Sequence, residues 1–262
     1  MQAVRTKSLA GITIVVTRSK SDNQLLSEKL RQLGAVTVEL PTIAIVPPEN
    51  TDHLDESIRT LSKYDWLIFT SVHGVEFFSK RMTALAEPID SLHEVKVAAI
   101  GPATAAALRR LGREPDYVPP EFLSERIAIG LGKVSGIRIL LPRADIASTR
   151  LPELLRRNGA SVEEIVAYRT VIPDDLSFDR VQSILQQHVD VITFTSPSTV
   201  QNLAYVTGPK RVGSLLNGVK VACIGPVTAE AARALGVRVD IVAPNHTIEN
   251  LVEAIVDEIR TV

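Results

Sequence analysis

The hydrophobic pattern of the chain alternates short apolar runs with longer amphipathic segments. GITIVVT at 11–17 is rich in β-branched residues, ends at a polar turn, and is followed at 22–33 by a segment with helical spacing. Short apolar runs bounded by turn residues predict buried strands, and segments with a period of about 3.6 residues predict helices. Because strands and helices alternate along the chain, the pattern predicts an α/β fold of parallel sheets with helices on both faces.

The same pattern occurs twice. Residues 95–112 (VKVAAIGPATAAALRRLG) and 219–236 (VKVACIGPVTAEAARALG) are identical at 13 of 18 positions, with a spacing of 219 − 95 = 124 residues. GITIVVTRS at residue 11 recurs as GIRILLPRAD at residue 136, a spacing of 136 − 11 = 125, and the same spacing relates DWLIFTSVHGVEFF to DVITFTSPSTVQNL. The chain therefore carries an internal duplication, in which each repeated piece reads as strand, turn and helix.

Several extended segments lie between these repeated pieces. VTVEL (36–40) and IAIVP (43–47) are short, are broken by prolines, and correspond to SVEEIVAYRTVIP (161–173) in the second half. They leave little room for a helix, so we interpret them as connecting strands instead of core strands. Further helices are predicted near 51–62, 148–157 and 177–187.

Polar turns follow the predicted strands in both halves. Ligands of open parallel sheets bind outside the carboxyl ends of the strands, and backbone N–H groups at helix starts favour anions. The candidate binding residues at these turns are Arg18, Thr70, Ser71, Gly101, Thr104, Arg143, Arg150, Ser196, Ser198, Thr199, Gly225 and Thr228. If the halves face one another, the turns line a cleft suited to a ligand with several negative charges. Taken singly, each turn is also an ordinary strand-to-helix turn, and each arginine is equally well interpreted as a solvated or helix-capping side chain.

Composition narrows the class of protein. The 262 residues are 45% hydrophobic and 23% charged with a formal net charge of −1, which argues against a nucleic-acid partner. No apolar run approaches the ~20 residues of a membrane span, and no signal peptide is recognised, so a cytoplasmic protein is expected. The single cysteine, Cys223, lies in an apolar run and is predicted to be a buried core residue. The five histidines are scattered, so no metal site is expected.

Motifs of the common catalytic machineries are absent from the sequence. It contains no GxxxxGK[ST] phosphate loop, no GxGxxG after the first strand, no nucleophile elbow and no paired catalytic carboxylates. Nucleotide cofactors therefore have no specific support. We expect a reaction that positioning of the substrate alone can direct.

Several motifs, taken together, resemble the uroporphyrinogen-III synthase family. FTS precedes a helix in both halves, IGPATA and IGPVTA follow it, TR and PRAD end the first strands, and VAYRT stands at 166–170. Each motif is weak alone, but their order covers the whole chain and is specific.

The resemblance implies two flavodoxin-like domains joined by a two-stranded β-ladder hinge. The implied domains are residues 1–42 with 173–262, and residues 50–164, with linker strands at 43–49 and 165–172. The duplication alone suggests a split near residue 135 instead.

The resemblance also implies the chemistry. Family members cyclise hydroxymethylbilane, a linear tetrapyrrole with many carboxylates: loss of the terminal hydroxyl gives an azafulvene, and ring D is inverted through a spiro intermediate. The substrate cyclises unaided to the wrong isomer, so the protein mainly has to hold it in the right conformation. The resemblance implies no cofactor, and the expected partners are this small molecule and a handover from the preceding pathway enzyme. No nucleic acid or membrane is involved, and a monomer is expected.

Tyr168, in VAYRT, matches the tyrosine that the family places in its cleft, which implies a hydrogen bond to the departing hydroxyl. A phenol is a weak acid at neutral pH, so a modest contribution is expected. Without the resemblance, a tyrosine packed on the connecting strands with its hydroxyl in water is favoured. The sequence departs from the family at His73, where Asn or Arg is commoner, and at Ala144, where Gly is commoner. His73 is expected to be a solvated turn residue.

Two other functions stay open on the residues alone. A hinged two-lobed binding or regulatory protein for an anionic ligand uses the same turns without catalysis. The absence of an appended DNA-binding domain and of a signal peptide argues against it. An enzyme of phosphorylated metabolites explains the helix N-termini but neither VAYRT nor the connecting strands.

Overall fold

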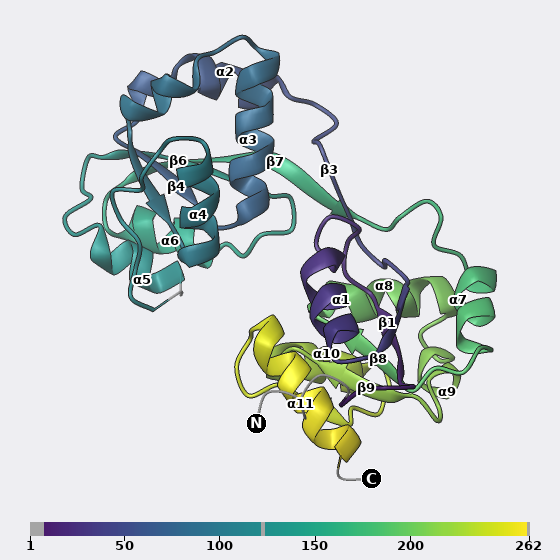
Figure 1. Ribbon diagram of the computed structural model, residues 1–262. Helices are drawn as coiled ribbons and strands as arrows, with labels where there is room; N and C mark the ends of the chain where they lie inside the picture. The colour runs from purple at the N-terminus through teal and green to yellow at the C-terminus, as the bar shows by residue number, and fades with distance from the viewer. Residues whose placement is uncertain (1–7, 122–123, 261–262) are drawn as a thin grey trace. The chain divides into compact units, whose positions relative to one another are not determined.

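The computed structural model describes residues 8–121 and 124–260, which belong to two compact units. Unit 1 comprises Met1–Ile45 and Val171–Val262, and unit 2 comprises Val46–Thr170. The chain leaves unit 1 within strand β3 (Ala44–Val46) and returns to it within strand β7 (Ser161–Val171) (Figure 1). The division does not follow the duplication, because β6 of the second repeat completes the sheet that β4 and β5 of the first repeat begin.

Unit 1 contains a five-stranded parallel sheet with the order β10-β9-β8-β1-β2. In chain order this is 2-1-3-4-5, a common order of doubly wound sheets. The strands are β1 (Thr13–Val16), β2 (Val36–Glu39), β8 (Val191–Phe194), β9 (Lys220–Cys223) and β10 (Ile241–Val242). The helices are α1 (Asn23–Gln32), α7 (Phe178–Leu185), α8 (Pro197–Thr207), α9 (Val212–Leu215), α10 (Pro226–Ala234) and α11 (Ile248–Arg260).

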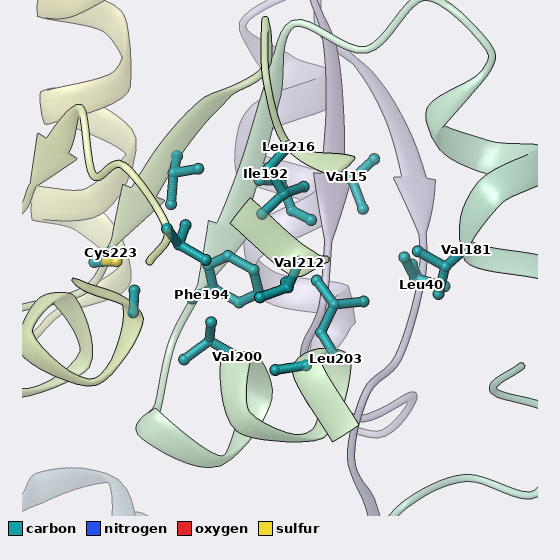
Figure 2. Packing of buried hydrophobic residues seen from close by; sticks show 14 of the residues in the cluster. Val15, Leu40, Val181, Ile192, Phe194, Val200, Leu203, Val212, Leu216 and Cys223 are labelled. Carbon is teal, nitrogen blue, oxygen red and sulfur yellow. The ribbon is translucent and has the colours of Figure 1, made fainter. Parts of the chain in front are cut away.

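Apolar residues are buried on both faces of this sheet. Successive strand residues point to opposite faces, so Ile14 and Val16 pack with α1 and α11, whereas Val15 packs with α7 to α10. Figure 2 shows the cluster on the face that contains Val15. Phe194 and Cys223 lie in this cluster, among side chains from several elements. Cys223 is fully buried, and this burial raises the pKa of its thiol to about 12. The prediction of a buried core cysteine is confirmed.

Unit 2 contains the sheet β3-β7-β6-β4-β5, in which β7, β6, β4 and β5 pair in parallel. Its remaining strands are β4 (Trp66–Phe69), β5 (Lys96–Ala99) and β6 (Arg138–Ala144). Helices α2 (Asp52–Arg59), α3 (Val72–Ala84) and α4 (Pro102–Arg110) pack on one face, and α5 (Ser124–Gly130) and α6 (Arg150–Arg157) on the other. Two short 3-10 helices, η1 (Leu61–Lys63) and η2 (Ile89–His93), complete the unit.

The structure confirms the predicted α/β class and corrects two local predictions. β2 pairs with β1 along its length, and β7 pairs with β6 from Ser161 to Tyr168, so both are core strands and not merely connections. Both strands have polar, solvent-facing positions, so their sequences lack the continuous apolar run that is typical of a core strand. Helix α6 begins at Arg150 and not at Ser148, because the Ser148 carbonyl accepts from Arg143 and its hydroxyl accepts from the Arg150 N–H at 3.3 Å.

Within the described ranges, no helix is long and apolar enough to cross a membrane.

Candidate functional site

The predicted site residues of unit 2 gather at one edge of its sheet. β4 pairs with both β5 and β6, and β6 pairs with β7, so the carboxyl ends of these parallel strands are neighbours. The residues at or after these ends are Thr70, Ser71, Gly101, Thr104, Arg143, Arg150 and Tyr168. The edge therefore combines hydroxyl-bearing turns at the starts of α3 and α4, two arginines and a phenol.

Tyr168 and Ser71 are joined directly although 97 positions separate them. The Tyr168 hydroxyl donates to Ser71 Oγ at 3.0 Å, and Ser71 Oγ also accepts the Gly74 N–H at 2.9 Å as the N-cap of α3. The tyrosine is only 8% exposed. Its ring stacks on Phe77 with centroids 5.8 Å apart and meets His73 edge-on at 5.6 Å. The expectation of a hydroxyl in water, favoured without the family resemblance, is therefore wrong.

An irregularity in β7 gives Tyr168 this direction. Arg143 pairs with Val166, but Ala144 pairs with Tyr168, so the register slips by one residue between them. Consecutive residues of a regular strand point to opposite faces, yet Ala167 and Tyr168 are both buried while Val166 is exposed. A bulge re-aims side chains in this manner and is common beside functional sites.

His73 is not the solvated turn residue expected from the sequence. Ser71 is the N-cap of α3 and Val72 is the first helical residue, so His73 is the second residue of the helix. Its side chain is 17% exposed, and its Nδ1 lies 3.4 Å from Glu76 Oε2. The imidazole is instead part of the wall that surrounds the Tyr168 ring.

The two arginines of unit 2 that were predicted as site residues, Arg143 and Arg150, differ in their surroundings. Arg143 is buried, and its guanidinium donates to Glu164 at 2.7 Å and to the Ser148 carbonyl. Glu164 also pairs with Arg156 at 2.9 Å. Arg150 is exposed at the start of α6. The charge of Arg143 is therefore balanced within unit 2, and its side chain fixes the loop that leads to α6.

The Gly-Pro turns of both units have the predicted form of strand, turn and helix. Gly101 and Gly225 are the N-caps of α4 and α10, and a proline follows each of them. Thr104 and Thr228, in the first turns of these helices, are each only 3% exposed. Both glycines have extended backbone, which any residue can adopt, and a Cβ atom at Gly225 would lie 2.2 Å from the ring of His246, an exposed side chain that would have to move aside. His246 was not among the predicted site residues, because only the tertiary structure brings it to this turn.

The other predicted residues of unit 1 lie at the ends of β1 and β8. Ser196 caps α8 in a capping box with Thr199, and its hydroxyl lies 2.9 Å from that of Ser198. Arg18 pairs with Asp22 at 3.5 Å, and within the described residues its buried Nε has no hydrogen-bond partner. β1 pairs with β8, so these turns are neighbours at the carboxyl edge of the sheet.

The chemistry of these turns is that of anion binding and of hydroxyl donors. Backbone N–H groups at the starts of α3, α4, α8 and α10 favour negative charge, and the side chains add hydroxyls and arginines. Among the residues that the structure describes, no cluster of three or more His, Cys, Asp or Glu side chains could hold a metal ion. Fold and site together define a doubly wound α/β protein of two units, with N–H- and hydroxyl-bearing turns at its strand ends and a phenol held against a serine.

Comparisons with known proteins identify the family. The family model described as Uroporphyrinogen-III synthase HemD matches residues 24–253. The uroporphyrinogen-III synthase of Synechococcus elongatus is 32% identical over 253 residues, which cover 94% of this chain and 95% of that protein. That of Chlorobaculum parvum is 28% identical over 252 residues, which cover 95% and 99%. The chain belongs to the uroporphyrinogen-III synthase family.

Solved structures of the family share the fold. A mutant uroporphyrinogen III synthase from the extremely thermophilic bacterium Thermus thermophilus matches with a TM-score of 0.66 at 20% identity, covering 96% of this chain and 100% of that one. Uroporphyrinogen-III synthetase from Helicobacter pylori matches with a TM-score of 0.66 at 18% identity, covering 94% and 99%.

Proposed function

We propose that the protein catalyses the uroporphyrinogen-III synthase reaction, the cyclisation of hydroxymethylbilane with inversion of ring D and loss of water. The observation that carries the proposal is the Tyr168 hydroxyl, held by Ser71 among anion-binding turns in a chain whose family match spans residues 24–253. The substrate is reactive without an acid of high strength. The main catalytic task is therefore to hold the substrate chain in the conformation that leads to the spiro intermediate. Correct orientation of reacting groups can by itself give a large rate enhancement.

The proposal assigns the substrate carboxylates to the turns at the strand ends. Backbone N–H groups and hydroxyls bind carboxylates in a fixed geometry without a strong net positive charge. The residues proposed to bind are Arg18, Thr70, Ser71, Gly101, Thr104, Arg143, Arg150, Ser196, Ser198, Thr199, Gly225 and Thr228. Arg143 already pairs with Glu164, so its proposed contribution is to hold its loop in place for binding.

The proposal also covers the organisation of the chain. We assign a flavodoxin-like fold to each unit and a linker role to β3 and β7, which act as a two-stranded hinge during substrate binding. The proposed domain limits are 1–42 with 173–262, and 50–164. A monomer that receives its unstable substrate from the preceding enzyme of the pathway fits this scheme.

The direct test is an isomer analysis. Purified protein is mixed with freshly generated hydroxymethylbilane, and the oxidised products are separated into isomers I and III. The proposal requires a strong excess of isomer III over the protein-free control. A product mixture equal to that control, from protein that binds hydroxymethylbilane, would favour a binding or regulatory protein without catalysis.

A further inference from the structure

We infer that Ser71 donates the proton to the departing hydroxyl of the substrate, and that Tyr168 stands behind it as the second member of a two-hydroxyl relay. The inference rests on the proposed function and deepens it, since it assigns the proton to a different side chain from the one that the family resemblance implies. Ser71 is the more exposed of the two residues, whereas Tyr168 is 8% exposed.

The hydrogen bonds around Ser71 set the direction of the relay. A serine hydroxyl has two acceptor positions and one proton. Ser71 Oγ accepts the Gly74 N–H at 2.9 Å and the Tyr168 hydroxyl at 3.0 Å, so both acceptor positions are used. Its own proton is the one that neither contact consumes, so the relay gives it to the departing hydroxyl and leaves carboxylate binding at this turn to the backbone N–H groups at the start of α3. The Tyr168 proton already points at Ser71, so it reaches the substrate through that oxygen.

The surroundings of Tyr168 keep the phenol in this position. Its ring is stacked on Phe77 and meets the edge of His73, both from the first two turns of α3. Lys80 lies over the Phe77 ring, with its Nζ 5.4 Å from the ring centroid. Because Ser71 caps the same helix, α3 fixes both the acceptor and the walls of the phenol.

The duplication supplies an internal comparison. At the repeat spacing of 125 residues, Ile43 corresponds to Tyr168 and Asn202 corresponds to Phe77. Asn202 donates to the Thr42 carbonyl at 2.9 Å and belongs to a helix that begins at another capping serine, Ser196. The capping serine is thus common to both copies, while the phenol and its aromatic wall belong to unit 2. Because the phenol and its aromatic wall occur in one copy only, they are not required to build the turn that both copies share.

The proton balance of the relay is closed. As the C–O bond of the substrate breaks, its electron pair leaves with oxygen, which takes the Ser71 proton and departs as water. Ser71 takes the Tyr168 proton, which leaves a phenolate. The phenolate recovers a proton in the final ring closure, when the unsubstituted α-carbon of ring D forms the closing bond and loses its hydrogen as that ring regains its aromaticity. The protein ends in its starting state.

A double-mutant cycle tests the relay. The values of kcat and KM for isomer III formation from hydroxymethylbilane are measured for the wild type, Ser71→Ala, Tyr168→Phe and the double variant. Residues that act as one unit give non-additive losses. We expect each single change to lower kcat by about a hundredfold, the lower end of what a positioned general acid contributes. The double change should cost no more than either alone, and KM should stay within about twofold. Multiplying losses, or a Ser71→Ala variant with unchanged kcat, would overturn the relay.

Matched variants separate catalysis from folding. Ser71→Ala also removes a helix cap, so Ser177→Ala, which removes the cap of α7, is its control for stability. Tyr205→Phe, at a tyrosine 78% exposed on α8, is the control for Tyr168→Phe. We expect both controls to keep the wild-type kcat. If Ser177→Ala lowers kcat as much as Ser71→Ala, the loss comes from capping and the relay is wrong.

Phe77 provides the test of positioning. We expect Phe77→Leu to lower kcat without raising KM, and Phe77→Tyr, which keeps an aromatic ring, to have nearly the wild-type kcat. In the Tyr168→Phe background, Phe77→Leu should cause no further loss of kcat. An additive loss in the double variant would contradict a role through Tyr168. A wild type that yields no excess of isomer III would sink the proposed function and the relay together, whereas an active wild type with independent losses would sink the relay alone.

Discussion

Unit 1 and unit 2 each end a strand with the residues Phe-Thr-Ser and begin a helix at the serine. Ser71 and Ser196 have nearly the same backbone conformation, with φ −160° and ψ 157° at one and φ −160° and ψ 160° at the other. In unit 2 the serine accepts the hydroxyl of Tyr168, while in unit 1 it lies against Ser198, and the position equivalent to Tyr168 is Ile43. Duplication has preserved the turn, and the proposed chemistry depends on the residues that differ between the copies.

The equivalent arginines Arg18 and Arg143, 125 residues apart, differ in the same manner. Arg143 is 8% exposed and joined to Glu164, whereas Arg18 forms one longer contact with Asp22. Unit 2 therefore uses its arginine for architecture around the Tyr168 strand, and unit 1 leaves its arginine closer to solvent. Equivalent positions in a duplicated protein consequently need not have equivalent roles.

The largest expected effect separates these two arginines. Arg143→Met should lower the free energy of unfolding by about 3 kcal/mol, because it removes two charge-assisted hydrogen bonds of a buried guanidinium and releases the Ser148 loop. Arg18→Met should change it by less than about 1 kcal/mol, since its contact with Asp22 is longer and the Arg18 side chain is more exposed than that of Arg143. Urea unfolding of the two variants measures both values. Equal losses of unfolding free energy in the two variants would contradict the structural role assigned to Arg143 alone.

The second prediction concerns acid stability. The Arg81 guanidinium, hydrogen-bonded to Asp55, holds the pKa of that carboxyl below its usual value and joins α2 to α3 in unit 2. A depressed folded-state pKa stabilises the protein above the unfolded pKa of about 3.9, and this stability is lost as the pH falls through the folded pKa.

Asp55→Asn should therefore cost about 2 kcal/mol at pH 7, and the difference from the wild type should shrink below about pH 4. The control is Asp175→Asn in unit 1, where the Asp175 carboxyl is about half exposed and its pair with Arg180 contributes less than about 1 kcal/mol. Unfolding curves over this pH range check the prediction. A difference that persists undiminished at pH 2 would contradict the assigned ion pair.

The third prediction contrasts the two capping serines. Ser196→Ala should raise KM by about three- to tenfold with little change in kcat, as expected for lost ground-state binding. Ser71→Ala should lower kcat instead. Steady-state kinetics with hydroxymethylbilane measure both parameters. A fall in kcat for Ser196→Ala equal to that for Ser71→Ala would mean that both copies take part in the chemistry.

The smallest expected effect lies in the packing of α1. Ser27 is fully buried there, and among the described residues its hydroxyl has no hydrogen-bond partner, whereas the equivalent position in α6 is Pro152. Ser27→Ala should raise the free energy of unfolding by about 0.5–1 kcal/mol, because it removes an unsatisfied buried hydroxyl and improves helix propensity. Thermal unfolding of the variant, compared with Ser183→Ala on α7, measures the gain. A loss of stability would contradict the prediction, because it would mean that the Ser27 hydroxyl makes a stabilising contact.

Local sequence patterns were sufficient to predict most of the elements. The apolar runs, the Gly-Pro turns and the amphipathic segments each depend on neighbouring residues, so α4 and α10 lie where their patterns indicate. The predictions failed where an element depends on distant partners. The residues of β2 alone predict a connection, because they do not identify its sheet partner β1. The sequence around His73 predicts a solvated residue, because Tyr168 lies far away in the chain.

The sequence by itself determined the duplication, the alternation of strands and helices, and the candidate residues at the strand ends, because these features are local or repeat at a constant spacing. Only the tertiary structure decided which of these residues touch. The slip in register between β6 and β7 buries Ala167 and Tyr168 together and carries the phenol to Ser71. That slip is a property of two paired strands, and the pattern of either strand alone does not contain it.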